Sequence, residues 1–445
     1  MGDEQSIECD LLVIGAGMAG LSAAGWAAER GARVIVVEKA AATGGSAVLS
    51  GGVLWTASSP QRMALYGGGN PELGAVICAT FPDAMSWLRT REIAVSPKMN
   101  VLHGYGYQID ILEHLRGCEA LVEQAGGHVV LGTETLELVR DADGTVIGAR
   151  TSHPDGKVTV HAPSTILATG GFQGSPEMRA RYIHPHAESM LLRSQPVSDG
   201  RGLCLGAAAG GEVPGSNRGF YGHLVSESPD WGQERLYTRL SQYHSDRTIL
   251  LNEQGHRFCD ETLGDHTNAC FTVSQPGARA LCFWDARVHA QYATQPVVAS
   301  AVPEDKMAVA LEHGGKGLVA QTLEEVAVFA AEHGFDGART LRSIRDFNQG
   351  ARHGWERLDP PRAETCEPLD KAPFYALIVH PAITFSFGGL SIDSGARVLR
   401  SDGNVIAGLL AAGADAGGAY GIGYAGGLAM AMTFGITAAR SAGWR

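Results

Sequence analysis

The sequence predicts an α/β protein in which a Rossmann-like nucleotide-binding domain is interrupted by a smaller α+β domain. Three observations predict it. The chain has 445 residues, enough for one large or two medium domains. A glycine-rich turn lies near the N-terminus between a predicted strand and a predicted helix. Further glycine-rich blocks lie in both outer parts of the chain, and the middle has a different composition. We expect the first part of the nucleotide-binding domain over 1–215, the inserted domain over 216–355, and the second part over 356–445.

The first element is a strand–turn–helix unit. Residues 7–14, "IECDLLVI", read as a buried strand, and "GAGMAG" follows with the complete GxGxxG spacing. Gly15 permits the tight turn, Gly17 lets a pyrophosphate approach the backbone, and Gly20 lets helix and strand pack closely. The helix N-terminus offers free N–H groups to the phosphates. A second strand ends at Glu38, 18 residues past Gly20, where an acid can bind the ribose hydroxyls.

The same segment could be mistaken for a membrane span, because residues 11–28 carry no charge over 18 positions. The preceding residues are acidic, unlike the basic start of a signal peptide, and glycines interrupt the first half. We therefore expect no transmembrane segment.

The segment after Glu38 distinguishes a flavin from a nicotinamide cofactor. Residues 42–57, "ATGGSAVLSGGVLWTA", contain two glycine pairs directly after the acid. A nicotinamide domain needs no such loop, whereas the ribityl chain and ring of a flavin extend past the pyrophosphate. The sequence therefore predicts FAD.

The amino-acid composition argues against some classes of function and favours others. Glycine makes up 59 of 445 residues, about 13% against roughly 7% on average, in clusters typical of backbone-built binding loops. The net charge of −12 without a basic patch argues against a nucleic-acid partner. The eight cysteines form no CxxC pair and have no histidine at zinc spacing, so no metal site is expected. Scattered single thiols fit the reducing cytosol, which predicts a cytoplasmic protein.

Five blocks together resemble the flavoproteins of the fumarate reductase/succinate dehydrogenase type, which include the 3-ketosteroid dehydrogenases. They are "VIGAGMAGLSAA", "EKAAATGGSAVLSGG", "STILATGGFQGS", "SDGRGLCLGAAAG" and "GLLAAGADAGGAYGIGYAGGLAMAMTFGITAA". The resemblance covers roughly 7–210 and 376–440. It implies an FAD-binding domain of the glutathione-reductase type and a capping domain that closes over the flavin.

The resemblance also implies the positions that bind the cofactor. Asp415 would bind the ribityl hydroxyls, and the first N–H groups of the last helix, at Gly427 and Leu428, would face the flavin N1–C2=O edge. Members with covalent FAD have a histidine near the position of Gly45, so the FAD is expected to be non-covalent here. The expected FAD-binding residues are Gly15, Gly17, Met18, Ala19, Gly20, Glu38, Lys39, Gly44, Gly45, Ser46, Ser50, Gly51, Gly52, Ala168, Thr169, Gly170, Asp199, Gly200, Gly413, Asp415, Gly427 and Leu428.

The inserted domain is expected to contain both strands and helices. Residues 247–261 read as a hairpin and 279–285 as a strand. Residues 323–333 predict a helix with a capping box formed by Thr322 and Glu325. A further helix follows at 338–354, and residues 58–125, in the first part of the FAD-binding domain, are expected to be mainly helical.

The chain departs from the family where a fumarate reductase needs cations to hold a dicarboxylate. Asp265 lies where the family has its proton-donating arginine, and Tyr424 where it has a second arginine. The place of a histidine is matched by 384–386, "TFS". The expected substrate is therefore a small, largely apolar and uncharged carbonyl compound.

The 3-ketosteroid dehydrogenase branch uses tyrosines near the flavin, and "GGAYGIGYAGG" looks similar. We expect its glycines to let the backbone touch the flavin ring, and its tyrosines to face the substrate. A tyrosine hydroxyl would bind the carbonyl, a tyrosine or histidine would take a proton, and hydride would pass to flavin N5, forming C=C. The candidate catalytic residues are Tyr424, Tyr420, His223, Tyr221 and Tyr107.

Three alternatives remain. The same site could run in reverse as an ene or enoate reductase, because sequence does not set the direction. The protein could be a flavin electron carrier without its own substrate, although the cap argues against an exposed ring edge. A flavin hydroxylase would need access for NAD(P)H, and no second dinucleotide motif is present. The electron partner stays open.

Overall fold

The computed structural model describes residues 5–215, 218–296, 302–354, 358–364 and 367–445. These residues form two compact units. Unit 1 consists of Met1–Ile183, Ser194–Phe220 and Phe385–Arg445, and unit 2 of His184–Arg193 and Tyr221–Thr384. The predicted domain boundaries at 216 and at 355–356 lie outside the described residues.

Unit 1 is built on a six-stranded sheet with the order β18-β19-β11-β2-β3-β7. Strand β2 pairs in parallel with β3 on one side and β11 on the other. Every residue of β2 and β3 is buried, as in parallel sheets covered on both faces. The α/β fold class predicted from the sequence is confirmed. The strands are β2 (Leu11–Ile14), β3 (Val34–Val37), β7 (His128–Val130), β11 (Thr165–Leu167), β18 (Arg397–Leu399) and β19 (Val405–Ala411).

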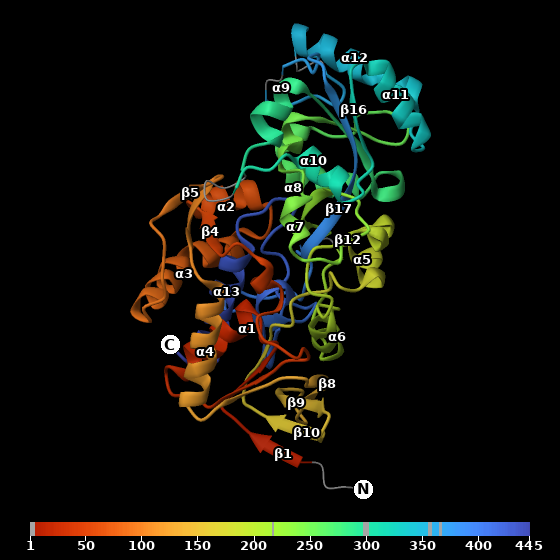
Figure 1. Ribbon diagram of the computed structural model, residues 1–445. Helices are drawn as coiled ribbons and strands as arrows, with labels where there is room; N and C mark the ends of the chain where they lie inside the picture. The colour runs from red at the N-terminus through yellow and green to blue at the C-terminus, as the bar shows by residue number, and fades with distance from the viewer. Residues whose placement is uncertain (1–4, 216–217, 297–301, 355–357, 365–366) are drawn as a thin grey trace. The chain divides into compact units, whose positions relative to one another are not determined.

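Helix α1 (Met18–Ala28) explains the uncharged segment at the N-terminus. All its residues are buried, and it lies beside α4 (Ile111–Gln124) and α13 (Gly427–Ser441) in Figure 1. Small residues permit this packing: a Cβ at Gly25 would lie 2.9 Å from the Cβ of Cys118 on α4. Across the described ranges, no helix combines the length and apolar character needed to span a membrane.

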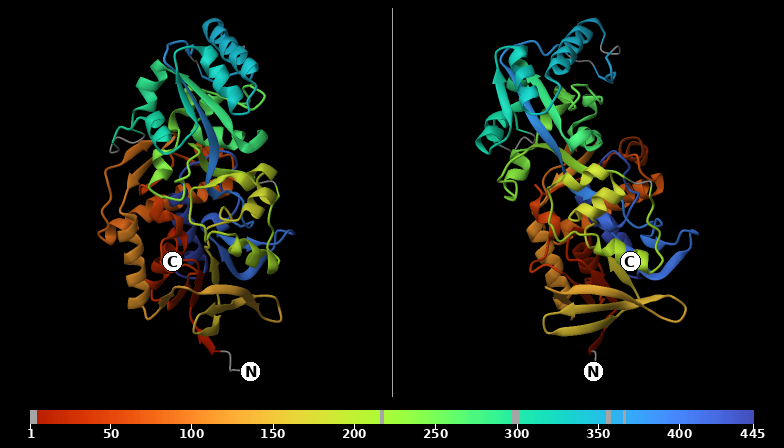
Figure 2. Two further views of the ribbon diagram at one scale, coloured as in Figure 1. Left: turned by 45° about the vertical axis from the view of Figure 1, so that its right-hand side comes forward. Right: turned by 90° about the vertical axis from the view of Figure 1, so that its right-hand side faces the viewer.

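Two smaller sheets and several helices complete unit 1. A four-stranded sheet, β1-β10-β9-β8, forms a separate layer, visible in gold and red in Figure 2. A three-stranded sheet has the order β4-β6-β5. The strands are β1 (Gln5–Glu8), β4 (Val53–Ala57), β5 (Met99–Val101), β6 (Gly104–Gln108), β8 (Glu134–Arg140), β9 (Val146–His153) and β10 (Gly156–His161); the helices are α2 (Pro60–Gly67), α3 (Pro71–Thr90), α5 (Pro176–Tyr182) and α6 (Arg201–Ala208).

The segment 58–125 is helical only in part. Helices α2, α3 and α4 are present, but residues 99–108 form the β5–β6 hairpin. Residues 103–108, "HGYGYQ", are thus mostly strand, because their alternating glycines let β6 run closely beside β4. A Cβ at Gly104 would lie 1.9 Å from the carbonyl oxygen of Thr56.

Unit 2 is organised around the long strand β17 (Phe374–Ser386), which pairs with β15 and β16 in antiparallel fashion and with β12 in parallel. This pairing places the second domain boundary later in the chain than the sequence predicted. The return to the FAD-binding unit comes after Thr384, not near residue 356, because most of β17 belongs to the sheet of unit 2. Strands β13 and β14 complete the sheet. The remaining strands are β12 (Leu191–Leu192), β13 (Phe220–Ser226), β14 (Ile249–Leu251), β15 (Ala280–Asp285) and β16 (Gly317–Ala320).

The hairpin expected at 247–261 forms only in part. Strand β14 pairs with β15. After the turn that follows β14, the chain pairs back with this strand at an isolated bridge between Leu251 and Arg257. Arg257 and Arg362 both bind the buried carboxylate of Glu261, at 2.6 and 3.0 Å. Because buried charges need such pairing, the segment after this turn is held by ion pairs in place of a second strand.

The capping box predicted for a helix of unit 2 can be followed atom by atom. The Thr322 side chain accepts from Glu325 N at 3.2 Å, and the Glu325 carboxylate accepts from Thr322 N at 3.3 Å. The capping box at the start of α11 is therefore confirmed. Helix α11 packs against α12, as Figure 1 shows. The helices are α7 (Leu236–Arg239), α8 (Asp265–Thr272), α9 (Ala286–Val288), α10 (Lys306–Glu312), α11 (Leu323–Glu332) and α12 (Gly337–His353).

Candidate functional site

The GxGxxG turn of unit 1 contains two glycines that the packing of the protein requires, Gly15 and Gly20. It also contains one, Gly17, that this packing does not require. A Cβ at Gly15, whose φ is +107°, would lie 2.3 Å from Ala168 O, and a Cβ at Gly20 would lie 1.9 Å from Gly15 O. A Cβ at Gly17 would meet only Gly44 O, at 3.9 Å. Gly17 is also the N-cap of α1, and no side chain among the described residues caps this helix. The space over Gly17 and the uncapped N–H groups thus fit a phosphate group.

The acid and base after β3 are held by their neighbours. Glu38 accepts hydrogen bonds from Ala16 N at 2.8 Å and Ala40 N at 2.7 Å, which fix its carboxylate beside the glycine turn. Lys39 forms an exposed ion pair with Asp199 at 2.7 Å. Two predicted cofactor residues from separate blocks therefore lie together, and each stays a prediction as a ligand of FAD.

The second glycine segment forms a short 3-10 helix over Gly45–Leu49. Gly44 precedes it in the left-handed conformation with φ +105°. The Ser46 hydroxyl lies 2.6 Å from the Ser194 hydroxyl, and Ser50 accepts from Gly52 N at 3.2 Å. The segment predicted to follow the flavin is thus joined to Ser194, which lies four residues before the block that starts at Ser198.

Asp415 shapes the turn that follows β11. Its carboxylate is fully buried and accepts from Thr169 N at 2.5 Å, Thr169 Oγ1 at 3.1 Å and Gly171 N at 3.1 Å. Burial raises the pKa of Asp415, while the hydrogen bonds from Thr169 and Gly171 oppose the shift. The structure gives Asp415 a role in holding this turn, and its contact with the ribityl chain stays a prediction.

Gln173 is a residue of this region that the sequence reasoning missed. It is 1% exposed, and its Nε2 donates to Gly170 O at 2.8 Å and to Ser194 Oγ at 3.2 Å. Within the described ranges its Oε1 has no hydrogen-bond partner. A buried acceptor without a partner is costly, so this atom fits a donor group of the cofactor. The glutamine in "TGGFQGS" was the available signal.

The glycine block at 417–427 contacts protein backbone. A Cβ at Gly421 would lie 2.2 Å from Gly68 O, and a Cβ at Gly423 would lie 1.5 Å from Tyr66 O. A Cβ at Gly426 would lie 1.8 Å from Trp55 O. We expected these glycines to admit the flavin ring, but packing against α2 and β4 already requires them.

Tyr424 lies three residues before the first residue of α13 and is partly exposed. Its hydroxyl oxygen accepts from Gly427 N at 2.9 Å. Its ring lies 5.5 Å from Trp55 and 6.1 Å from Phe385, both edge-on. The N–H of Gly427, expected to face the flavin edge, is engaged by Tyr424, whereas Leu428 stays a prediction as a flavin contact.

Tyr420 has a structural position. It is 1% exposed and its hydroxyl donates to Gly426 O at 3.1 Å. Burial raises its pKa well above the ordinary value. The prediction that Tyr420 moves a proton is therefore not supported, because the buried phenol instead supports the loop before α13.

Tyr107 lies away from Tyr424. It pairs with Leu54 across the β4–β6 ladder, whereas Trp55, which contacts Tyr424, pairs with Gly106. Successive residues of a strand point to opposite faces, so Tyr107 and Trp55 lie on opposite sides of this sheet. Tyr107 packs near Arg89, 5.0 Å from its ring. The catalytic role predicted for Tyr107 is not supported.

Unit 2 brings together two predicted catalytic residues and one acid. Tyr221 and His223 are two residues apart on β13, so their side chains point to the same face. Asp265 is the first residue of α8, and its Oδ2 contacts His223 Nδ1. His223 Nε2 lies 3.1 Å from the Tyr221 hydroxyl. At the position that the resemblance matches to the family's arginine, Asp265 thus contacts a histidine.

Arg193 is a second residue that the sequence reasoning missed. It is half-buried and donates to Thr384 Oγ1 at 3.1 Å, Tyr243 OH at 3.3 Å and Tyr237 O at 3.2 Å. Among the described residues no carboxylate forms an ion pair with it. Unit 2 therefore contains a cation held by neutral groups, which qualifies the expectation of a site poor in cations.

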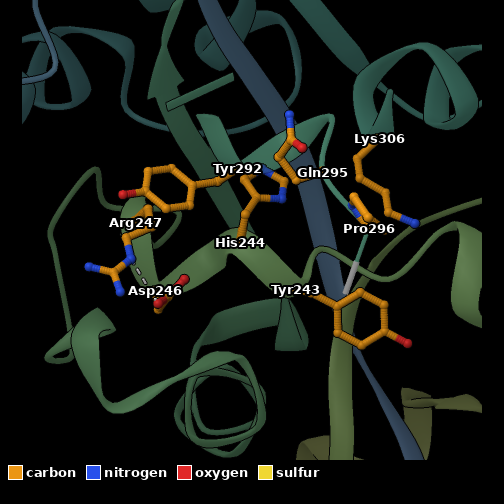
Figure 3. Close-up of a pocket in the computed structure, with 8 residues that line it drawn as sticks. All are labelled: Tyr243, His244, Asp246, Arg247, Tyr292, Gln295, Pro296 and Lys306. Carbon is orange, nitrogen blue, oxygen red and sulfur yellow. Dashed lines mark ion pairs between the residues drawn. The ribbon is translucent and has the colours of Figure 1, made fainter. Parts of the chain in front are cut away.

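A hollow of about 230 Å³ lies in unit 2 beside the segment 243–247, and Figure 3 shows the side chains that line it. Tyr243 points away from His244 in this view. Burial lowers the pKa of His244 to about 3. Asp246 and Arg247 form an ion pair at 3.0 Å. No group of three metal-binding side chains occurs in the part of the chain that the structure describes.

Comparisons with known proteins agree with the geometry of unit 1. Residues 10–102 and 109–428 match the family model FAD_binding_2, the FAD binding domain. The chain is 29% identical to urocanate reductase of Eggerthella lenta, covering 92% of this chain and 70% of the relative. It is 28% identical to fumarate reductase (cytochrome) of Shewanella frigidimarina, covering 97% and 76%. The structure is similar to 3-ketosteroid-delta4-(5alpha)-dehydrogenase from Rhodococcus jostii in complex with 4-androstene-3,17-dione, with TM-score 0.76, 20% identity, and coverage of 99% and 98%.

Proposed function

Because the chain belongs to the FAD-binding domain family, we propose that it oxidises a CH–CH bond next to a carbonyl group, forming C=C in a largely apolar, uncharged substrate. FAD is its cofactor, and it is a flavoprotein oxidoreductase of the fumarate reductase/3-ketosteroid dehydrogenase superfamily. The uncapped turn at Gly17 and the acceptor Oε1 of Gln173 fit this cofactor. When bound, FAD supplies the hydride acceptor.

The hydrogen bond between Tyr424 and Gly427 carries the proposal. The Gly427 N–H lies at the positive end of α13 and draws electron density from the phenolic oxygen. Hydrogen bonds in such a chain strengthen one another, so the hydroxyl becomes a better donor toward a carbonyl oxygen. A neutral donor suits a ketone, whereas a carboxylate favours an arginine. Tyr424 would thus stabilise the enolate-like charge that develops when the neighbouring C–H is broken.

The surroundings of Tyr424 favour an apolar substrate. Trp55 and Phe385, which both belong to unit 1, lie beside its ring. Aromatic rings offer a large apolar contact area and few hydrogen-bonding groups. The proposed substrate is therefore a cyclic or polycyclic ketone.

A second candidate function is reduction of an activated C=C that carries a carboxylate. Arg193 favours it, since its half-buried guanidinium binds neutral groups among the described residues and can pair with a carboxylate. The names of the two relatives, urocanate reductase and fumarate reductase, agree with this direction. The same flavin site serves both reactions.

Anaerobic mixing of the FAD-loaded protein with single compounds distinguishes the two functions. Loss of flavin absorbance with saturated ketones such as cyclohexanone or androstane-3,17-dione, with a product two hydrogen atoms lighter, supports oxidation. Reoxidation of the dithionite-reduced flavin only by urocanate or fumarate supports the alternative. No response to any of these compounds would contradict both.

A further inference from the structure

We propose that Asp265 is a positioning residue that fixes the tautomer of His223, so that Tyr221, His223 and Asp265 form a proton relay. Its part in the reaction rests on the proposed function, whereas its arrangement stands on contacts inside unit 2.

The two nitrogen atoms of His223 have different partners. Nδ1 contacts Asp265 Oδ2, and Nε2 lies 3.1 Å from the hydroxyl of Tyr221. Asp265 and His223 are both buried, with 9% and 5% of their surfaces exposed. The three side chains are thus in series, and Tyr221 at one end of the series is partly exposed.

The chemistry of the carboxylate determines where the imidazole proton lies. An ionised carboxylate can only accept, so Nδ1 must carry the hydrogen and Nε2 of the neutral ring must accept from Tyr221. Leu224 N donates to Asp265 Oδ1 at 3.2 Å, so Oδ1 accepts from the backbone while Oδ2 faces the imidazole.

Burial keeps the imidazole neutral when no proton is being moved. It lowers the pKa of His223, and Asp265 opposes the shift whereas Arg193 adds to it. Tyr243 packs edge-on against the ring at 4.9 Å, and its hydroxyl accepts from Arg193. Among the described residues, the charged and titratable groups beside His223 include Asp265 on α8, Tyr221 on its own strand, and Tyr243 with Arg193; the ring of His266 lies 5.4 Å from that of Tyr221.

The relay conserves atoms and charge. As the substrate C–H bond breaks, the Tyr221 oxygen takes that proton, and the original phenolic proton passes to His223 Nε2. The electron pair left on carbon would become the second bond of C=C as the adjacent carbon gives up hydride, for which bound FAD would be the acceptor. The imidazolium that forms faces Asp265, which balances its charge. In the reductive direction the same steps run backwards.

The relay also accounts for the missing arginine. The resemblance places the family's proton donor at the position of Asp265, and an ionised aspartate has no proton to give. Through His223, Tyr221 becomes the proton-carrying group in this chain. His223 and Tyr221 were predicted catalytic, but their contact with Asp265 was not predicted.

A tautomer measurement tests the arrangement without any substrate. The FAD-loaded protein is labelled with ¹⁵N-histidine, and His223→Gln assigns the signals of His223. At neutral pH we expect hydrogen on Nδ1. In Asp265→Asn, Leu224 N–H selects the amide oxygen, so the amide NH₂ faces Nδ1 and hydrogen moves to Nε2. Hydrogen on Nε2 in the unsubstituted protein, or no change in Asp265→Asn, would overturn the relay.

The role of Asp265 in the reaction is tested by kinetics, with whichever ketone or enone reacts in the flavin assay. Asp265→Asn should slow the flavin half-reaction by about 100-fold, with little change in half-saturation and a changed pH profile. Asp230→Asn is the matched control, because Asp230 Oδ2 contacts His313 Nδ1 at 3.2 Å in the same unit. Equal losses in both variants, or none in Asp265→Asn, would overturn the role. If the tautomer result holds and no compound reacts, the positioning by Asp265 stands and the proposed function fails.

Discussion

The hydroxyl oxygen of Tyr424 accepts a hydrogen bond from Gly427 N at 2.9 Å. This bond joins the side chain proposed to bind the substrate to the first residue of α13. The positive end of the helix therefore acts on the phenol, whose hydrogen it makes easier to donate. Tyr424 is thereby polarised by the fold before any substrate arrives.

Tyr424→Phe should keep FAD and lose turnover. The ring packing against Trp55 is retained, but the carbonyl loses its donor, so we expect about a 100-fold lower rate of flavin reduction. The flavin absorbance of the purified variant and the anaerobic half-reaction measure both. Turnover within about twofold of the unsubstituted protein would remove Tyr424 from the mechanism.

Tyr420→Phe should show the opposite pattern. The hydroxyl of Tyr420 donates to Gly426 O inside the protein, so its loss should lower the free energy of unfolding by about 1 kcal/mol. Turnover should stay near that of the unsubstituted protein, because a buried phenol meets no substrate. Urea unfolding and the flavin half-reaction test this; a large fall in rate with unchanged stability would restore Tyr420 as a catalytic residue.

Two glycines of the GxGxxG turn should respond differently to alanine. Gly17→Ala leaves the protein unstrained, since its Cβ would meet only Gly44 O at 3.9 Å, but it fills the space expected for phosphate. We expect an unchanged melting temperature of the apoprotein and FAD binding weakened by about tenfold. Gly20→Ala forces a Cβ to 1.9 Å from Gly15 O and should cost about 3 kcal/mol of stability. Similar melting temperatures for the two apoproteins would contradict this reading.

His114 should make the protein sensitive to acid. It is buried, bonded to Ser22 Oγ at 3.0 Å, and burial lowers its pKa from 6.5 to about 3. The unfolded chain takes up a proton below pH 6.5 while the folded chain does not until about pH 3, so stability falls as the pH drops through this window. Between pH 7.5 and 5 the loss is about 2 kcal/mol.

His114→Gln removes this proton uptake and keeps a group that can bond to Ser22. We expect its free energy of unfolding to fall about 2 kcal/mol less than that of the unsubstituted protein over the same pH range. Urea unfolding at both pH values measures the difference. Identical pH dependence in the two proteins would show that His114 is not the sensitive group.

Acid precipitation should release the flavin. Gly45 lies near the position where the resemblance places the histidine of covalent members, so no side chain is expected to hold the ring covalently. All of the yellow colour should appear in the supernatant, and mass spectrometry should find an unmodified chain. Flavin retained in the pellet would contradict non-covalent binding.

Short-range patterns were enough for the nucleotide-binding half of the fold. The turn from β2 into α1 depends on glycines within one motif, and the capping box of α11 on Thr322 and Glu325 three residues apart. Such features follow from neighbouring residues, whose contacts are set by the geometry of a single strand or helix. The sequence by itself therefore determined the α/β class and the glycine turn, and with the family resemblance it indicated FAD.

Tertiary packing decided what residues far apart in the chain do to one another. Gly423 must be glycine because Tyr66 O approaches it, and Tyr107 is separated from Tyr424 by the alternation of β4 and β6. Asp265 acts on His223, 42 positions away, only because α8 and β13 meet in unit 2. The spacing of residues along the chain does not predict such tertiary contacts, because they depend on strand register and on which helix end packs against which strand.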